Sequence, residues 1–178
     1  MEATLSATNS QTGAVTPEEL CRLYSPSVCR FAAMMASGAA EADDLAQDAL
    51  LRAVRSLGSY DPARGSLEAW LWRIVANAAK DSARRGQRAR NLIARLGFDP
   101  PRESDSVEDA VLERLRDADL HARMRLLPLR DQTLLALRFG AGLDIDEVGA
   151  AVGLNPDSAG KAIRRALARL RARLEVIT

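Results

Sequence analysis

Two groups of basic side chains carry the chemistry that this sequence offers. The first group recurs at spacings of three and four residues and consists of Arg73, Asn77, Lys80 and Arg84. Cations at these spacings lie on one helix face and suit a phosphate backbone, and an amide between them can both donate to and accept from a base. The loop before them holds Tyr60 and Arg64, a ring and a guanidinium that could stack on or hold an unpaired base.

The second group lies near the C-terminus. Its members expected to point outward are Asp157, Ser158, Lys161, Arg164, Arg165 and Arg169. Long donors near the start of a helix suit the major groove, where arginine and lysine bind guanine edges and phosphates. The predicted duplex-DNA residues are Ser158, Lys161, Arg164 and Arg165. For either group alone, a solvated helix face remains the simpler alternative.

A helix-turn-helix is expected to position the second group. The pattern predicts a short helix over 144–152, a tight turn over 153–156 and a long helix over 157–176. Gly153 stands where the chain needs a positive φ. The positions that such a motif uses for internal packing hold Val148, Val152, Ala159 and Ile163. Before it, Pro128 starts a helix that Gly140 and Gly142 end.

Three helices are expected to position the first group. Thr16 and Glu19 form a capping box for a helix that runs to about Ser37, stops at Gly38 and is kinked or broken at Pro26. The next helix has a buried face formed by Ala42, Leu45, Ala46, Ala49, Leu50, Ala53, Val54 and Leu57.

A third helix follows the turn-rich loop 58–65. It is capped by Ser66 and is expected to end near Gly86. Its inward residues are expected to be Leu67, Trp70, Leu71, Ile74, Val75 and Ala78, with Trp72 only partly buried. The basic residues Arg73 to Arg84 then lie on the opposite face.

The composition indicates an all-α protein of two small helical domains joined by a flexible linker. Apolar residues make up 47% of the 178 residues and aromatic residues 4%, so the core must consist largely of leucine and alanine. We expect a disordered tail (1–15), a first helical domain (16–86), a linker (87–106) and a helix-turn-helix domain (107–178). Ser106 and Asp109 form a second capping box at the start of the last domain.

The distribution of charge supports two surfaces for a polyanion. The net charge is +1, but residues 73–95 carry +6 and residues 161–175 carry +5. Residues 99–119 between them carry −5, and residues 41–48 hold four acids and no base. Two basic blocks separated by an acidic one suggest two sites for nucleic acid, joined by a segment that DNA repels.

The sequence offers no sign of an enzyme. Its single histidine is His121, and no catalytic triad, phosphate loop or metal-ligand spacing is recognisable, so no cofactor, metal or small-molecule substrate is expected. Cys21 and Cys29 are eight residues apart in a predicted helix, which favours reduced, packed thiols. Without a signal peptide or a membrane span, the chain is expected to be cytoplasmic.

Two long runs resemble the extracytoplasmic-function sigma factors of bacterial RNA polymerase. They are "EADDLAQDALLRAVRSLGSYDPARGSLEAWLWRIVANAAKDSARR" and "LPLRDQTLLALRFGAGLDIDEVGAAVGLNPDSAGKAIRRALARLR". The first run is highly specific, whereas many regulators end in a helix-turn-helix like the second. The resemblance implies a factor that binds core polymerase, directs it to promoters and helps to melt the minus-ten element, and it leaves open whether an anti-sigma factor is a further partner.

The resemblance also implies roles for particular residues. The clamp coiled coil of the largest polymerase subunit would bind a face formed by Asp44, Gln47, Asp48 and Leu51. Independently, Leu51 is the one apolar residue on an otherwise acidic outer helix face, which indicates a contact. The helix residues Arg73, Asn77 and Lys80, with the loop 60–65, would bind the minus-ten strand, and Lys161, Arg164 and Arg165 would bind the minus-thirty-five element.

One departure from the family concerns the recognition helix. Relatives commonly have a "GTVKSR" type of sequence where this chain has "DSAGKA" (157–162), so Gly160 and Ala162 replace residues that are usually basic. The usual minus-thirty-five preference therefore cannot be transferred. A self-sufficient helix-turn-helix regulator is the alternative function, although it leaves the acidic face around Leu51 unexplained.

Overall fold

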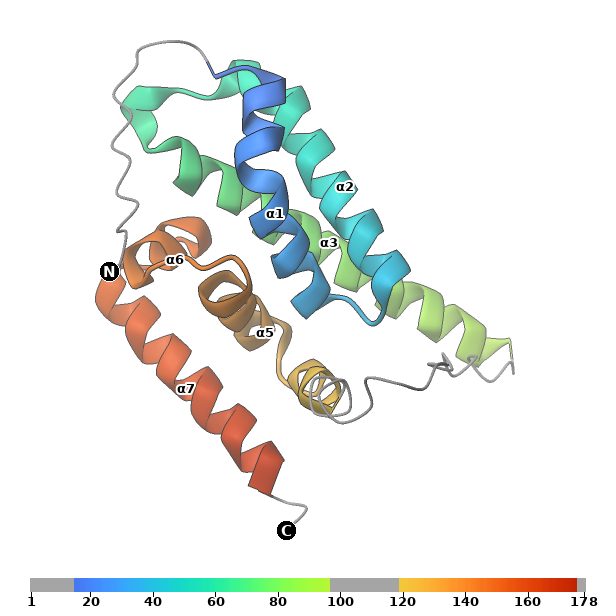
Figure 1. Ribbon diagram of the computed structural model, residues 1–178. Helices are drawn as coiled ribbons and strands as arrows, with labels where there is room; N and C mark the ends of the chain where they lie inside the picture. The colour runs from blue at the N-terminus through green and yellow to red at the C-terminus, as the bar shows by residue number, and fades with distance from the viewer. Residues whose placement is uncertain (1–14, 97–118, 176–178) are drawn as a thin grey trace, which may run out of the picture.

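The computed structural model describes residues 15–96 and 119–175, and in these ranges every regular element is helical. The first unit consists of α1 (Pro17–Met35), α2 (Ala39–Ser56), the turns η1 (Leu57–Ser59) and η2 (Pro62–Arg64), and α3 (Leu67–Arg95). The second consists of helical residues 119–125, α5 (Leu129–Leu135), the π-helical η3 (Ala136–Gly140), α6 (Ile145–Val152) and α7 (Pro156–Glu175). The α1 and α2 helices lie side by side, and α5 to α7 gather on the other side of α1 (Figure 1). The all-α prediction is confirmed.

Local capping signals start these helices as the sequence predicts. The Thr16 hydroxyl accepts from the Glu19 N–H at 3.2 Å and the Glu19 carboxylate accepts from the Thr16 N–H at 3.1 Å. The Ser66 hydroxyl caps α3 by accepting from the Ala69 N–H at 3.2 Å. These bonds satisfy N–H groups that have no partner inside the helix.

The first helix differs from the prediction in two respects. Pro26 does not break α1, which continues from Pro17 to Met35. A proline removes only one backbone donor, and burial of Val28 and Phe31 holds the following turns against the core. Gly38, which was expected to stop α1, is instead the N-cap of α2. On α1, Cys21 is half-buried as expected, but Cys29 is exposed and not packed.

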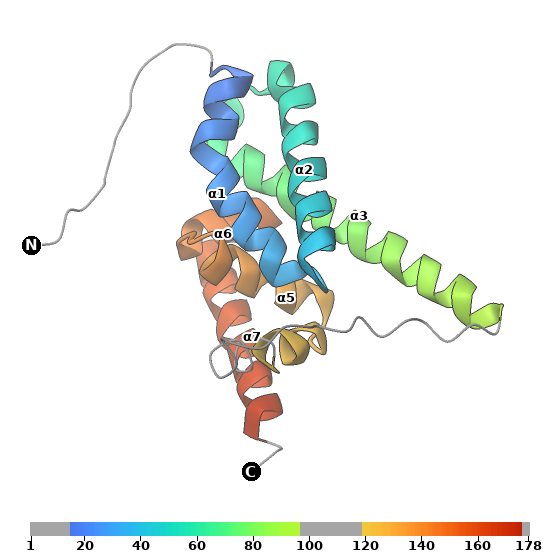
Figure 2. The same ribbon diagram turned by 45° about the vertical axis from the view of Figure 1, so that its right-hand side comes forward.

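The third helix is longer than predicted and is buried on a broader face. It runs past Gly86 to Arg95, and its far end extends away from the other helices (Figure 2). Trp70, expected to face inward, is half-buried and packs on the core, whereas Trp72, expected to be only partly buried, is fully buried. Trp72 packs edge-on against Phe31 of α1, with ring centroids 6.0 Å apart. Both α2 and α6 pack against α3, so more of its residues are buried than the single inward face predicted from the sequence.

The two helical units pack against each other through one continuous core. The buried cluster joins Phe31, Trp72 and Val75 of the first unit to Leu137 and Val148 of the second. All eight apolar residues predicted for the inner face of α2 belong to this core or pack on it, which confirms that prediction. The predicted tail up to residue 14, the Ser106 capping box and the second half of the predicted linker, from residue 97, lie outside the described residues. The first half of that predicted linker is helical and belongs to α3 up to Arg95.

Contact between the units is tightest at Gly140, where η3 meets α1. The Gly140 carbonyl accepts a hydrogen bond from Arg30 Nε at 3.1 Å. A Cβ at this position would lie 2.7 Å from Met34 Sδ and 3.1 Å from the Arg30 carbonyl oxygen. A glycine therefore lets η3 approach the α1 backbone this closely, whereas a Cβ would require Met34 to move and α1 to shift by a few tenths of an ångström.

We expect Gly140→Ala to destabilise the protein by about 1–3 kcal/mol, because the α1 backbone would have to move away from η3. Gly160→Ala is the matched control, since a Cβ there would meet its nearest neighbour, Ile145 Cγ2, at an ordinary 3.7 Å. That change should be neutral or stabilise α7 by up to about 1 kcal/mol. Urea unfolding of both variants provides the measurement, and equal stabilities would contradict the close approach at Gly140.

Candidate functional site

The predicted minus-ten residues lie on one face of α3. Arg73, Asn77 and Arg84 are exposed and Lys80 is half-buried. The opposite side of the helix carries the buried residues, including Leu71 and Val75. The structure therefore brings together three cations and one amide along about three turns of a rigid helix.

In the loop that precedes α3, the Arg64 side chain is exposed, whereas the Tyr60 side chain is partly buried by contacts within the loop and with α3. Arg64 is exposed in η2. The Tyr60 ring packs against Trp70 at a centroid distance of 5.6 Å, and its hydroxyl donates to the Gly65 carbonyl at 3.1 Å. Gly65 has φ +146°, which favours glycine. Tyr60 thus closes the loop through its hydroxyl, and its ring packs at a tilt against Trp70.

The outer face of α2 carries the residues predicted to bind polymerase. Asp44 and Gln47 are exposed, and Leu51 is 51% exposed. A single exposed apolar side chain is common on protein surfaces, so the prediction of a contact at Leu51 depends on its position among these acidic and polar residues. Asp48, the fourth predicted residue, lies in a different environment.

Asp48 belongs to an ion-pair network that joins α2 to α3. Its carboxylate lies 2.9 Å from Arg52 and 3.3 Å from Arg85. Arg52 also bonds Asp81 of α3 at 2.7 Å, and this hydrogen bond is the main cause that lowers the pKa of the Asp81 carboxyl. Sequence analysis missed Arg52, although its position four residues after Asp48 is the spacing of a helical ion pair.

The helix-turn-helix forms as predicted, with one additional close contact. Val148, Ala159 and Ile163 are buried and Val152 is half-buried. Gly153 adopts the left-handed conformation with φ +72°. The sequence did not single out Gly149, where a Cβ would lie 2.7 Å from the Leu154 carbonyl oxygen. This glycine lets the turn fold back onto α6.

The predicted duplex-DNA residues point away from this packing. Lys161, Arg164 and Arg165 are exposed and Ser158 is half-buried. Lys161 forms a surface ion pair with Asp157 at 3.1 Å, of a kind worth about 1 kcal/mol or less. These side chains are therefore available to an anionic ligand along the first half of α7.

Acidic side chains meet where α3 contacts α6. The Glu68 carboxyl, on the first turn of α3, lies within hydrogen-bonding reach of Glu147, the residue that completes the capping box of α6. Loss of hydration raises the pKa of Glu68, and repulsion by Glu147 and Asp144 adds to the effect. Burial, together with Glu68 nearby, also raises the pKa of Tyr24 on α1 to about 12.

We expect Glu68→Gln to stabilise the protein at neutral pH. A carboxyl whose pKa is raised by folding binds its proton more tightly in the folded state, so folded-state stability falls as the pH rises from the unfolded value toward the raised one. The stability difference between Glu68→Gln and wild type should therefore be present at pH 7 and vanish near pH 4. Thermal unfolding across this range measures it.

The control is Asp43→Asn, which neutralises an exposed acid on α2. It should give no comparable stabilisation at pH 7, because Asp43 does not lie at the contact between α3 and α6. If Glu68→Gln gave no gain at pH 7, the acidic contact between α3 and α6 would not form in solution.

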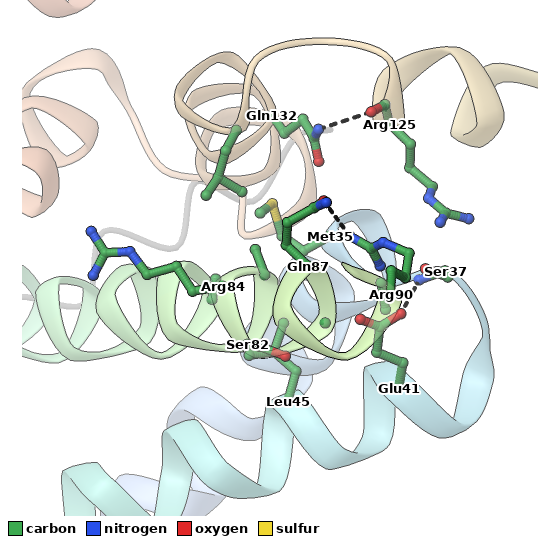
Figure 3. A pocket seen from close by; sticks show the side chains of 15 residues that line it. Met35, Ser37, Glu41, Leu45, Ser82, Arg84, Gln87, Arg90, Arg125 and Gln132 are labelled. Atoms are coloured by element: carbon green, nitrogen blue, oxygen red, sulfur yellow. Dashed lines mark hydrogen bonds between the residues drawn. The ribbon is translucent and has the colours of Figure 1, made fainter. Parts of the chain in front are cut away.

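A pocket of about 390 Å³ lies between the two units (Figure 3). Arg84 is the one predicted DNA-binding residue that lines it. Several of its polar groups bond one another: Arg90 donates to Gln87 at 3.1 Å, and Gln132 donates to the Arg125 carbonyl at 3.2 Å. The pocket therefore offers little organised chemistry for a small ligand.

The described residues contain no group of three or more His, Cys, Asp or Glu side chains that could hold a metal ion. Within the same ranges, no helix combines the length and apolar character needed to cross a bilayer.

Comparisons with known proteins agree with this arrangement. The Sigma-70 region 2 family matches residues 20–89. The RNA polymerase sigma factor CarQ of Myxococcus xanthus is 30% identical over 86% of each chain. The ECF RNA polymerase sigma factor SigE of Mycolicibacterium smegmatis is 31% identical over 95% of this chain and 65% of its own length. The BldN sigma factor of Streptomyces coelicolor is covered over 57% of its length, so the chain spans less than two thirds of these two relatives.

Solved structures share the fold across both helical units. The sigma factor RpoE of Bartonella quintana, in complex with the anti-sigma factor NepR, superposes with a TM-score of 0.66 at 24% identity, over 90% of this chain and 98% of that one. CnrH, in complex with the cytosolic domain of CnrY, gives a TM-score of 0.66 at 23% identity over 91% and 89%. With a matched region 2, a helix-turn-helix and a CarQ-like sequence over most of its length, this chain belongs to the extracytoplasmic-function family of RNA polymerase sigma factors.

Proposed function

We propose that this chain binds core RNA polymerase, directs it to specific promoters and helps to melt the minus-ten element. The observation that carries the proposal is the presence of three separate exposed faces on one chain. They are the acidic, single-leucine face of α2, the basic face of α3 and the basic face of α7. A protein that only bound duplex DNA would have no use for the first of them.

Each of the three faces binds a different partner. Asp44, Gln47 and Leu51 of α2 contact the clamp coiled coil of the largest polymerase subunit, with Asp48 held at the edge by its arginine partners. On α3, Arg73 and Lys80 hold phosphates of the melted strand and Asn77 contacts a base. On α7, Lys161, Arg164 and Arg165 contact the minus-thirty-five duplex. The factor itself catalyses no reaction, and its partners place it in the cytoplasm.

Promoter binding requires the two helical units to separate. The minus-ten and minus-thirty-five elements are about 25 base pairs apart, which is roughly 85 Å along B-form DNA. The helices that would bind them belong to units that share one core, so a closed molecule cannot reach both elements. Residues 97–118 connect the units and, fully extended, could span on the order of 70 Å. Binding to core polymerase would supply the energy for separation.

An anti-sigma factor is a further proposed partner. RpoE of Bartonella quintana, which shares this fold, is bound to the anti-sigma factor NepR in its solved structure. A protein that held the two units of this chain together would prevent promoter binding. Such a partner should compete with core polymerase for the purified chain in a gel-filtration assay, and simultaneous binding of both would count against this role.

Run-off transcription with core polymerase on genomic fragments tests the proposed function. Promoter-specific transcripts that depend on this chain are the expected result. The alternative, a self-sufficient helix-turn-helix regulator, predicts instead sequence-specific binding to duplex DNA by the chain alone and no transcripts from core polymerase. That second result would overturn the proposal.

A further inference from the structure

Methionine side chains gather where the two helical units meet. The sequence has four methionines, Met1, Met34, Met35 and Met124, and the structure describes the last three. Met34 and Met35 end α1 and pack on the core that joins the units. Met124 is buried in a smaller apolar cluster of the second unit. Within residues 15–96 and 119–175, Met34 is the one residue of the first unit that also packs on this smaller cluster.

The sulfur of Met34 lies directly against η3. A Cβ on Gly140 would be 2.7 Å from Met34 Sδ, closer than two such atoms can approach, so no room remains for an added atom on the η3 side of the sulfur. The cation that shares this contact is Arg30. It donates to the Gly140 carbonyl through Nε at 3.1 Å and to the Ser27 hydroxyl through Nη2 at 2.9 Å. An acceptor introduced on the sulfur would have to compete with both for Arg30.

Met34 is nevertheless accessible to a small solute. It is half-buried, as is Met35, whereas Met124 is 3% exposed. A thioether is oxidised by hydrogen peroxide, which transfers one oxygen atom to the sulfur. The O–O bond breaks and an S–O bond forms, so the sulfur loses two electrons and the peroxide is reduced to water. The product, methionine sulfoxide, is polar, and specific reductases convert it back to the thioether.

We propose that Met34 is a reversible oxidation site, with a peroxide as the oxidant, that controls separation of the two helical units. The inference rests on the proposed function, because it concerns the separation that promoter binding requires. A sulfoxide oxygen cannot point toward η3 without pushing the units apart, and turning it toward the solvent withdraws the side chain from both apolar clusters. Either change destabilises the closed form, so the open form that binds core polymerase becomes more populated.

Met35 provides an internal comparison. It follows Met34 and therefore lies about 100° further around α1. Its side chain lines the pocket of about 390 Å³ between the units (Figure 3). An oxygen atom added to Met35 has room in this pocket, so its oxidation should leave the contact between α1 and η3 unchanged. The proposal therefore assigns the response to Met34 and not to its neighbour.

The affinity of the chain for core RNA polymerase tests this proposal. A ligand that binds the open form binds more tightly when that form is more populated. The full chain is treated with hydrogen peroxide, freed of it, analysed by peptide mass spectrometry and titrated with core polymerase. We expect Met34 and Met35 to be oxidised before Met124, because Met124 is buried. The dissociation constant should fall by about tenfold, the effect of an interfacial polar group that lacks a partner. Methionine sulfoxide reductases should restore the original value.

Two pairs of variants separate Met34 from the rest of the chain. Met34→Leu keeps an apolar side chain of similar size, so it should bind polymerase as untreated wild type does and should not respond to peroxide. Met35→Leu should respond as wild type does. Met34→Gln introduces a polar acceptor without any oxidant and should reproduce the tighter binding, whereas Met35→Gln should not. A damaged fold cannot imitate this result, because partial unfolding would weaken polymerase binding.

The outcomes separate this proposal from the proposed function. If neither untreated nor oxidised wild type bound core polymerase, the proposed function itself would fail. If wild type bound, and oxidation of Met34 left the dissociation constant unchanged or raised it, the function would stand and the assignment of Met34 would be overturned. It would equally be overturned if Met34 were oxidised no faster than the buried Met124, or if peroxide-treated Met34→Leu bound as tightly as oxidised wild type.

Discussion

The double substitution Asp44→Lys/Leu51→Ala is expected to prevent this chain from co-purifying with core RNA polymerase. Leu51 is 51% exposed at the centre of an otherwise polar face, and Asp44 lies two turns earlier on the same face. Central apolar anchors of protein interfaces are worth about 2 kcal/mol or more, roughly 30-fold in affinity, and the charge reversal adds repulsion. The helical content should not change, because neither side chain belongs to the core.

Asp43→Lys is the matched control, because it makes the same change of charge at an exposed position about 100° around the same helix. It should leave polymerase binding nearly intact. Asp48 is unsuitable for this test, since its reversal would also break the contacts with Arg52 and Arg85. Co-purification of the Asp44→Lys/Leu51→Ala variant at the wild-type yield would show that the face of α2 is not the docking surface.

Asn77→Ala is expected to change which minus-ten base is tolerated, whereas Lys80→Ala and Arg73→Ala should weaken opening at all promoters alike. Asn77 is exposed between the two cations on the face of α3 opposite the core. An amide that bonds a base edge contributes about 1–3 kcal/mol of discrimination, while a cation on a phosphate contributes affinity without sequence preference. Transcription from a promoter library randomised across the minus-ten element separates the two effects.

The loop before α3 provides the control for this prediction. Tyr60→Phe removes only the hydroxyl bond to the Gly65 carbonyl and keeps the ring against Trp70. It should loosen the loop without changing base preference as Asn77→Ala does. A library profile of Asn77→Ala identical to that of wild type would leave Asn77 a solvated helix residue with no part in sequence choice.

Much of the fold was predictable because its signals are local. The Thr16–Glu19 capping box, the inner face of α2 and the left-handed Gly153 depend on residues within a few positions of one another, and all three formed as expected. Where a prediction from the sequence was wrong, a contact with a distant residue outweighed the local signal. Pro26 did not break α1, because the turns after it are held by burial of Val28 and Phe31. Trp72 is buried under α1, which no spacing within α3 could indicate.

The candidate site shows the same division. The basic faces of α3 and α7 and the exposure of Leu51 follow from helical period and charge alone. Which of the charged side chains are paired with one another did not follow from the sequence. Asp48 is held by Arg85, 37 residues away, and Asp131 by Arg169, 38 residues away. Whether a charged side chain is open to a partner depends on neighbours that the sequence does not place next to it.

By itself, then, the sequence determined most of the helices and their apolar and charged faces. It could do so because a period of 3.6 residues assigns each side chain to a face without reference to the rest of the chain. The family was indicated separately, by the resemblance of two long runs to the sigma factors. Only the tertiary structure decided what each face meets. Packing of α5 on α7 brings Arg130 beside the recognition helix, and the close approach at Gly140 joins the two units in one core. Such contacts depend on shape complementarity between distant segments, which no local pattern encodes.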